Sequence, residues 1–141
     1  MWKNKFTIEE CNKMCENTIH DSLGIKLTEV GPDFIKGTMP VDSRTVQPFR
    51  LLHGGASVVL AESLGSIASL MMIDHNKNIS VGLDINANHV RAVKSGIVTG
   101  TARPINIGGK IHIWEIKLTN EADKLVCIAR LTVTVLPKGM I

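Results

Sequence analysis

A stretch of 23 residues, from Leu51 to Ile73, is almost wholly apolar, and its one charged side chain is Glu62. The stretch has no proline and is rich in helix-favouring residues, so it predicts one long helix that is buried around most of its circumference. A carboxylate within such a helix is costly unless it is paired or neutralised. Glu62 is therefore the first candidate for a functional residue.

The same stretch is long enough to cross a bilayer, but its composition argues against a membrane span. It includes His53, Glu62, four serines and three glycines, and no basic cluster flanks it. The whole chain of 141 residues is 44% hydrophobic and 21% charged, which is typical of a soluble protein. We expect one domain, spanning residues 1–141.

Charge and cysteine content narrow the classes of protein further. The net charge of +3 is spread without a run of basic residues, which argues against nucleic-acid binding. The N-terminal sequence lacks the apolar region of a secretory signal. Three cysteines without a CxxC pair fit free thiols in a reducing compartment. We therefore expect a cytoplasmic protein.

The periodicity before the long helix predicts a short helix and two strands. A capping box at Thr7–Glu10 begins a helix that is expected to run to about Asn17. Residues 25–30 and 34–40 predict two strands, which the turn at residues 31–33 joins. Residues 41–52 are expected to form a loop that leads into the long helix.

Four further strands are predicted after the long helix. Apolar and polar residues alternate over 79–88, and strands are expected at 96–102, 110–118 and 125–136. Pro104 and the pair Gly108-Gly109 separate the second of these four strands from the third. A single apolar helix is best buried by a strongly curved antiparallel sheet wrapped around it, which predicts an α+β fold with six strands. The open edges of such a sheet favour oligomers.

Most standard catalytic motifs are absent, and the remaining candidates cluster around the long helix. There is no GxSxG, HExxH, paired CxxC, phosphate-binding loop or dinucleotide-binding glycine pattern. Glu62 and Ser66 share a helix face, and Gly54 lies near the helix N-terminus, where free N–H groups favour a developing oxyanion. With Gln47 and His53 as polar positioning groups, this set suffices to hydrolyse an activated acyl group.

Residues 39–66, MPVDSRTVQPFRLLHGGASVVLAESLGS, resemble the hotdog-fold acyl-CoA thioesterases. In particular they resemble the branch that includes the Arthrobacter-type 4-hydroxybenzoyl-CoA thioesterases, the enterobactin proofreading thioesterase and 1,4-dihydroxy-2-naphthoyl-CoA thioesterase. The resemblance continues through VGLDINANHVR at 81–91, PINIGGK at 104–110 and WEI at 114–116. It implies a hotdog fold, in which a curved six-stranded antiparallel sheet wraps around one long central helix. It also implies hydrolysis of an aromatic or hydroxyaromatic acyl-CoA to the free acid and coenzyme A.

The resemblance assigns a role to each of the five candidates. Glu62 matches the nucleophile or general base, and the backbone N–H of Gly54 matches the group that polarises the thioester carbonyl. Gln47 and His53 match groups that position the substrate and assist the leaving thiol, and Ser66 matches the hydroxyl that orients water. In this family Glu62 would face Gly54 and Gln47 of a neighbouring subunit, in a homotetramer made of two dimers. No metal or organic cofactor is implied.

The resemblance also suggests which residues hold coenzyme A, with Arg91 and Lys110 supplying positive charge to its phosphates. The full set is Gly82, His89, Val90, Arg91, Ala92, Asn106, Ile107, Gly108, Gly109, Lys110 and Ile111. The chain departs from the family pattern at Arg50, where a glycine is common beside the acyl pocket. We expect Arg50 to narrow the pocket or to favour an anionic or hydroxylated acyl group.

Several alternatives stay open at this point. His53 is also expected to cap its own helix, Gln47 to bind loop backbone, and Ser66 to allow close helix packing. The whole chain also fits an acyl-thioester hydratase or dehydratase, or a non-catalytic module that binds acyl-CoA. For the thioesterase, menaquinone biosynthesis, siderophore proofreading and general clearance of aromatic acyl-CoA are all compatible with the sequence.

Overall fold

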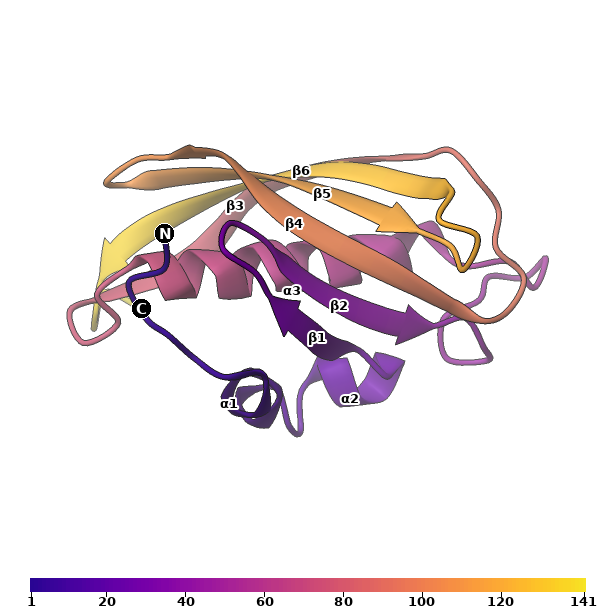
Figure 1. The fold of residues 1–141 in the computed structure, drawn as a ribbon, viewed down its shortest axis with the longest axis horizontal. Coiled ribbons are helices and arrows are strands. Elements are labelled where there is room, and N and C mark those ends of the chain that lie inside the picture. Colours follow the sequence, from indigo (N-terminus) through magenta and orange to yellow (C-terminus); the bar gives the residue numbers. More distant parts are fainter.

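The long helix α3 (Gly54–Met72) lies along the concave face of a six-stranded sheet in the computed structural model, which describes all residues from 1 to 141 (Figure 1). All strand pairs are antiparallel, and the order across the sheet is β1-β2-β4-β5-β6-β3. The strands are β1 (Lys26–Val30), β2 (Ile35–Pro40), β3 (Asn78–His89), β4 (Ile97–Ile107), β5 (Ile111–Thr119) and β6 (Leu125–Pro137). Two short helices, α1 (Ile8–Met14) and α2 (Ile19–Leu23), lie next to β1, at the opposite edge from β3 (Figure 1).

Bulges bend the sheet around the helix. The pairing register shifts in β1, β3 and β4, at Leu27/Glu29, Gly82/Asp84 and Pro104/Asn106. Each bulge adds a residue to one strand and so increases its local bend and twist. The curved sheet buries ten of the nineteen residues of α3, and its inward side chains, such as Trp114 and Leu131, form one core with them.

The apolar character of α3 is explained by this burial. The helix is long and apolar enough to cross a membrane, but 56% of its most apolar window is buried inside the protein. No membrane-spanning segment is therefore indicated. The remaining face of α3 is a half-buried stripe, and its members are Val58, Val59, Glu62, Ser63, Ser66 and Leu70.

Two expectations about individual elements were wrong. The helix expected to run to about Asn17 ends at Met14, and residues 18–24, for which no element was expected, contain α2, which Thr18 caps at its start and Gly24 ends in a left-handed conformation. Five residues are too few for a periodic signal. The strand expected at 96–102 continues through Pro104 to Ile107 as β4. The neighbouring strand β2 begins with Ile35 opposite Ala102, so beyond this pair one side of β4 has no partner, and Pro104 needs no N–H there.

Candidate active site

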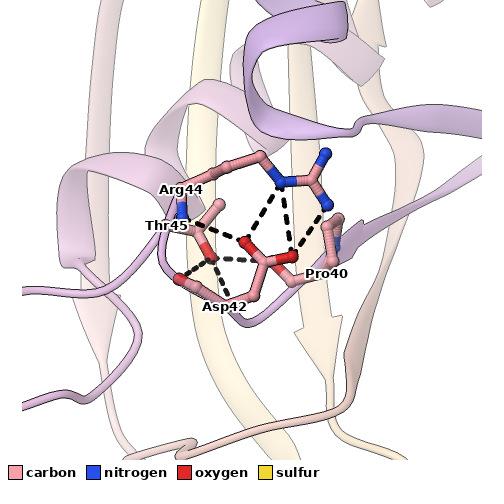
Figure 2. A network of polar contacts seen from close by, with 4 residues as sticks. All are labelled: Pro40, Asp42, Arg44 and Thr45. Carbon is pink, nitrogen blue, oxygen red and sulfur yellow. Dashed lines mark hydrogen bonds and ion pairs between the residues drawn. The ribbon is translucent and has the colours of Figure 1, made fainter.

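The loop before α3 is fixed at its start by a compact polar turn (Figure 2). The Thr45 hydroxyl donates to the Pro40 carbonyl at 2.7 Å and accepts from the Asp42 N–H at 3.1 Å. The Arg44 side chain donates to the Asp42 carboxylate, with Nη2 2.7 Å from Oδ2, and these bonds hold the pKa of that carboxyl below its usual value. Thr45 is buried, and its carbonyl accepts the His53 N–H at 2.8 Å. The turn therefore sets the position at which α3 begins.

Gln47 lies at the centre of the next turn. Its backbone N–H donates to the Leu51 carbonyl, and its own carbonyl accepts the Arg50 N–H, both at 2.8 Å. The Gln47 side-chain Oε1 accepts the Phe49 N–H, so the amide group binds loop backbone through its oxygen. Its Nε2 group has no protein partner and remains a free donor on the wall of a cavity.

His53 caps the start of α3 through its side chain. Its Nδ1 accepts the Gly55 N–H at 2.7 Å, and its backbone is extended, with φ −69° and ψ 129°. Because Nδ1 accepts a hydrogen bond, the proton of the neutral imidazole is on Nε2, which can then only donate. The next N–H group, that of Gly54, has no hydrogen-bond acceptor in the protein. The N–H of Ala56 also has no acceptor, so the helix begins with two free backbone donors, of which Gly54 lines a cavity together with Gln47.

A cavity of about 410 Å³ opens at this end of the helix. His89, at the end of β3, packs directly on Gly54, because a Cβ atom placed on Gly54 would lie 2.8 Å from His89 Nε2. The Arg91 Nε donates to the Leu125 carbonyl at 3.1 Å, which fixes the segment after β3 against β6. The cavity is lined by Gln47, Leu51, Leu52, Gly54, Ser57, His89, Val90, Arg91, Ala92 and Val126.

Glu62 lies apart from this cavity within one chain. It is eight residues after Gly54, which places it about 12 Å further along the helix axis. Its carboxylate lies against Gly82 in β3, where a Cβ atom would overlap Glu62 Oε1. Neither Glu62 nor Ser66, one turn further on, has a side-chain hydrogen bond or an ion pair in the protein. Both residues lie on the half-buried stripe of α3.

The second segment expected to bind coenzyme A lies at the far end of the molecule. The β4–β5 connection, with Gly108 and Gly109, lines another cavity of about 470 Å³ beside Met72 and Ile73 at the C-terminal end of α3. A helix of 19 residues is about 28 Å long, so one chain does not bring this segment next to the His89 segment. Lys110 and Ile111 are exposed there, and so is Asn106 on the last part of β4.

The structure adds residues that were not among the candidates. Ser57 and Val126 line the first cavity, and His112 lines the second. The buried Ser69 hydroxyl accepts the Trp114 Nε1–H at 2.7 Å and lies 3.1 Å from His112 Nδ1, and burial lowers the pKa of this histidine. Nothing in the sequence pattern separates Ser57 from the other serines of α3, because only burial and hydrogen bonding distinguish them.

No group of three His, Cys, Asp or Glu side chains lies close enough to bind a metal ion. The cavity at the start of α3 offers the free N–H of Gly54 and the amide of Gln47, His53 lines a separate cavity beside it, and the unpaired Glu62 carboxylate lies further along the helix. Together these groups can polarise a carbonyl and supply a nucleophile or a base.

Comparison with known proteins agrees with this chemistry. Residues 49–127 match the family model described as the thioesterase superfamily. The chain belongs to this superfamily. It is 46% identical to the 1,4-dihydroxy-2-naphthoyl-CoA hydrolase of Escherichia coli over 136 residues, which cover 96% of this chain and 99% of that one. The comparison confirms that the chain is a thioester hydrolase.

Solved structures give the same result for the fold. A mutant thioesterase from Pseudomonas aeruginosa superimposes with a TM-score of 0.95 at 48% identity, covering 96% of this chain and 98% of that chain. A thioesterase from Haemophilus influenzae superimposes with a TM-score of 0.93 at 49% identity, covering 96% of this chain and 94% of that chain. The expected hotdog fold, with six antiparallel strands around one long helix, is confirmed.

Proposed function

We propose that this thioesterase hydrolyses an aromatic or hydroxyaromatic acyl-CoA to the free acid and coenzyme A, at a site shared between two subunits. The observation that carries the proposal is the pair of unsatisfied groups on α3, the Gly54 N–H at the helix N-terminus and the Glu62 carboxylate further along. Because its relative in Escherichia coli is named for 1,4-dihydroxy-2-naphthoyl-CoA, this thioester is the first candidate substrate. That substrate would assign the protein to menaquinone biosynthesis.

In the proposed reaction the thioester carbonyl oxygen accepts the Gly54 N–H, where the helix dipole also favours negative charge. The Glu62 carboxylate either attacks the carbonyl carbon or removes a proton from water that attacks it, and Ser66 orients this water. The new C–O bond forms as the C–S bond breaks, and coenzyme A leaves as the thiolate, which takes up the proton released from water. Where Glu62 itself attacks, water then hydrolyses the mixed anhydride, which releases the acid and regenerates the carboxylate. The free Nε2 donors of Gln47 and His53 position the thioester and stabilise the departing sulfur.

Two subunits are needed because the reacting groups of one chain are too far apart. About 12 Å of helix separates Gly54 from Glu62, whereas both must reach the same carbonyl carbon. Strand β3 is an edge strand, so its outer side is free to pair with β3 of a second copy. Antiparallel pairing would bring the end at Asn78 of one copy next to His89 of the other. We further propose that two such dimers form a tetramer.

The same pairing accounts for the two separated segments expected to bind coenzyme A. The cavity beside Arg91 in one subunit would meet the cavity beside Gly108 and Gly109 in the other. Arg91 and Lys110 would then supply positive charge to the phosphates from opposite sides of the interface. Gly82 keeps a different role in this arrangement, because its missing side chain leaves room for the Glu62 carboxylate.

The hydratase alternative is disfavoured by the hydrogen bond of His53. A hydratase of this fold needs a histidine that exchanges a proton next to the carbonyl, together with a carboxylate. The Nδ1 of His53 is occupied by the Gly55 N–H, so the ring offers a donor and no free base. A thioesterase needs only that donor.

The proposal is tested by following free thiol release from a panel of acyl-CoA substrates. The panel contains 1,4-dihydroxy-2-naphthoyl-CoA, 4-hydroxybenzoyl-CoA, phenylacetyl-CoA and a medium-chain aliphatic acyl-CoA. We expect turnover with an aromatic member and a loss of at least about 100-fold in kcat for Glu62→Gln, which keeps the shape of the side chain but removes its charge.

Matched variants separate the roles in this experiment. Ser63→Ala, on the same half-buried stripe as Glu62, should keep its activity and so controls for changes to that face of α3. Full activity of Glu62→Gln would refute the role of the carboxylate. Failure of the wild-type protein to release thiol from any member would refute the proposed substrate class, and loss of the double bond of an enoyl-CoA would identify a hydratase instead.

A further inference from the structure

Ser57 is almost wholly buried, at 1% exposure, yet its hydroxyl has no hydrogen-bond partner in the protein. The residue lines the 410 Å³ cavity at the start of α3. His20 Nδ1 is the one unpaired side-chain atom that is completely closed to solvent. The Ser57 oxygen is unpaired too, but it is not completely closed to solvent. The Ser57 hydroxyl therefore reaches the wall of the cavity.

An unpaired hydroxyl in such a buried place needs an explanation. Leaving a buried polar group without a partner costs about 1–3 kcal/mol, and most such groups in native proteins are paired. The other fully buried serine of the helix, Ser69, follows this rule, because its hydroxyl contacts both Trp114 and His112. Ser57 differs from Ser69 in lining a cavity, so its hydroxyl is free to bond to a ligand there.

Ser57 and Gly54 line the same cavity at the start of α3. The two residues are three apart in the helix and so share one face. Side chains in a helix lean toward its N-terminus, so the Ser57 side chain covers the turn that contains Gly54. Both residues line the same cavity, and a single ligand oxygen there can contact both donors.

We infer that the Ser57 hydroxyl is a second hydrogen-bond donor to the thioester carbonyl oxygen, beside the Gly54 N–H. This inference rests on the proposed function. No histidine nitrogen or carboxylate forms a hydrogen bond with Ser57, so the hydroxyl keeps its proton and does not attack the substrate. It makes and breaks no covalent bond. Its hydrogen bond strengthens as the C–O bond forms and negative charge develops on the oxygen.

The kinetic test compares Ser57→Ala with Ser57→Thr and Ser69→Ala, on whichever acyl-CoA the wild-type protein hydrolyses best. We expect Ser57→Ala to lower kcat by at least about tenfold while KM changes by less than about threefold, because the bond is strongest in the transition state. Ser57→Thr keeps the hydroxyl and should retain most of kcat. Ser69→Ala should lower thermal stability but leave kcat within about twofold, since its hydroxyl bonds only within the core.

A spectroscopic measurement reports the hydrogen bond directly. The Glu62→Gln protein should bind the thioester without hydrolysing it, so the infrared stretching frequency of a ¹³C-labelled carbonyl can be recorded in the complex. We expect this frequency to be lower than in solution, and to rise toward the solution value when Ser57→Ala is added. A structural role for Ser57 would leave the frequency unchanged.

Three results would overturn the inference. They are a kcat of Ser57→Ala within twofold of the wild type, equal losses in Ser57→Ala and Ser57→Thr, and a carbonyl frequency that does not respond to Ser57→Ala. Each can be seen only when the wild-type protein releases thiol. Absence of release in the wild type refutes the proposed function instead, so the two failures are distinguishable.

Discussion

Arg50 has a left-handed backbone conformation, with φ 64°, in the loop between Gln47 and the start of α3. A side chain with a Cβ atom pays roughly 1–2 kcal/mol for this conformation, whereas glycine adopts it freely. We therefore expect Arg50→Gly to be about 1 kcal/mol more stable to unfolding than Arg50→Ala, as measured by urea denaturation at one protein concentration. Both variants remove the same charge, so their difference isolates the backbone. An Arg50→Ala protein as stable as Arg50→Gly would contradict this account.

The sequence pattern alone identified part of the candidate site at the residue scale. Glu62 could be singled out because one carboxylate in an apolar helix is rare and costly. His53 and Gln47 were expected either to bind substrate or to bind backbone, and the structure has each of them binding backbone through one atom while a second atom stays free. Ser57 could not be singled out, because its unpaired hydroxyl is a property of three-dimensional packing.

At the scale of elements, the C-terminal end of α3 is capped by a segment far away in the sequence. Asn4 Nδ2 donates to the carbonyls of Leu70 and Ile73, at 2.9 and 2.7 Å, and the N–H groups of Lys3 and Asn4 both donate to the Met71 carbonyl. These bonds satisfy carbonyls that the helix end would otherwise leave free. The N-terminal segment therefore holds the end of the helix in place.

We expect Asn4→Ala to lower the free energy of unfolding by about 1–2 kcal/mol, because two side-chain hydrogen bonds to these carbonyls are lost. Lys5→Ala is the matched control, since Lys5 is exposed and its side chain makes no hydrogen bond or ion pair. Thermal and urea unfolding measure the stability of both variants against that of the wild-type protein. Equal stabilities for the two variants would mean that the cap contributes nothing.

The long helix and all six strands were predictable, because each carries a periodic pattern long enough to read. The contacts of residues 1–6 with α3 were not, since a remote cap has no local signal. The course of β4 beyond Ala102 was missed for another reason. Proline usually ends a strand, but Pro104 lies where β2 no longer runs alongside, and only the order of strands in the sheet reveals this.

At the scale of the whole molecule, the proposed site requires Gly54 from one subunit and Glu62 from another. This arrangement predicts complementation between two inactive proteins. Glu62→Gln lacks the carboxylate, and Gly54→Val lacks an open cavity because a Cβ atom there meets the His89 ring. Each variant alone should be nearly inactive. A dimer containing one copy of each has one site made of two altered parts and one site made of two unaltered parts.

Coexpression of the two variants in equal amounts should therefore restore about a quarter of the wild-type activity, since half of the dimers are mixed and each mixed dimer has one intact site out of two. The measurement is thiol release by the coexpressed protein, compared with each variant expressed alone at the same protein concentration. If one chain instead supplied both groups of a site, Gly54→Val and Glu62→Gln would each inactivate the site of their own chain. Coexpression would then restore no activity. Activity is recovered only if a second subunit supplies the Glu62 carboxylate, which lies about 12 Å from Gly54 in its own chain. If no activity is recovered, the helix of one chain supplies both groups.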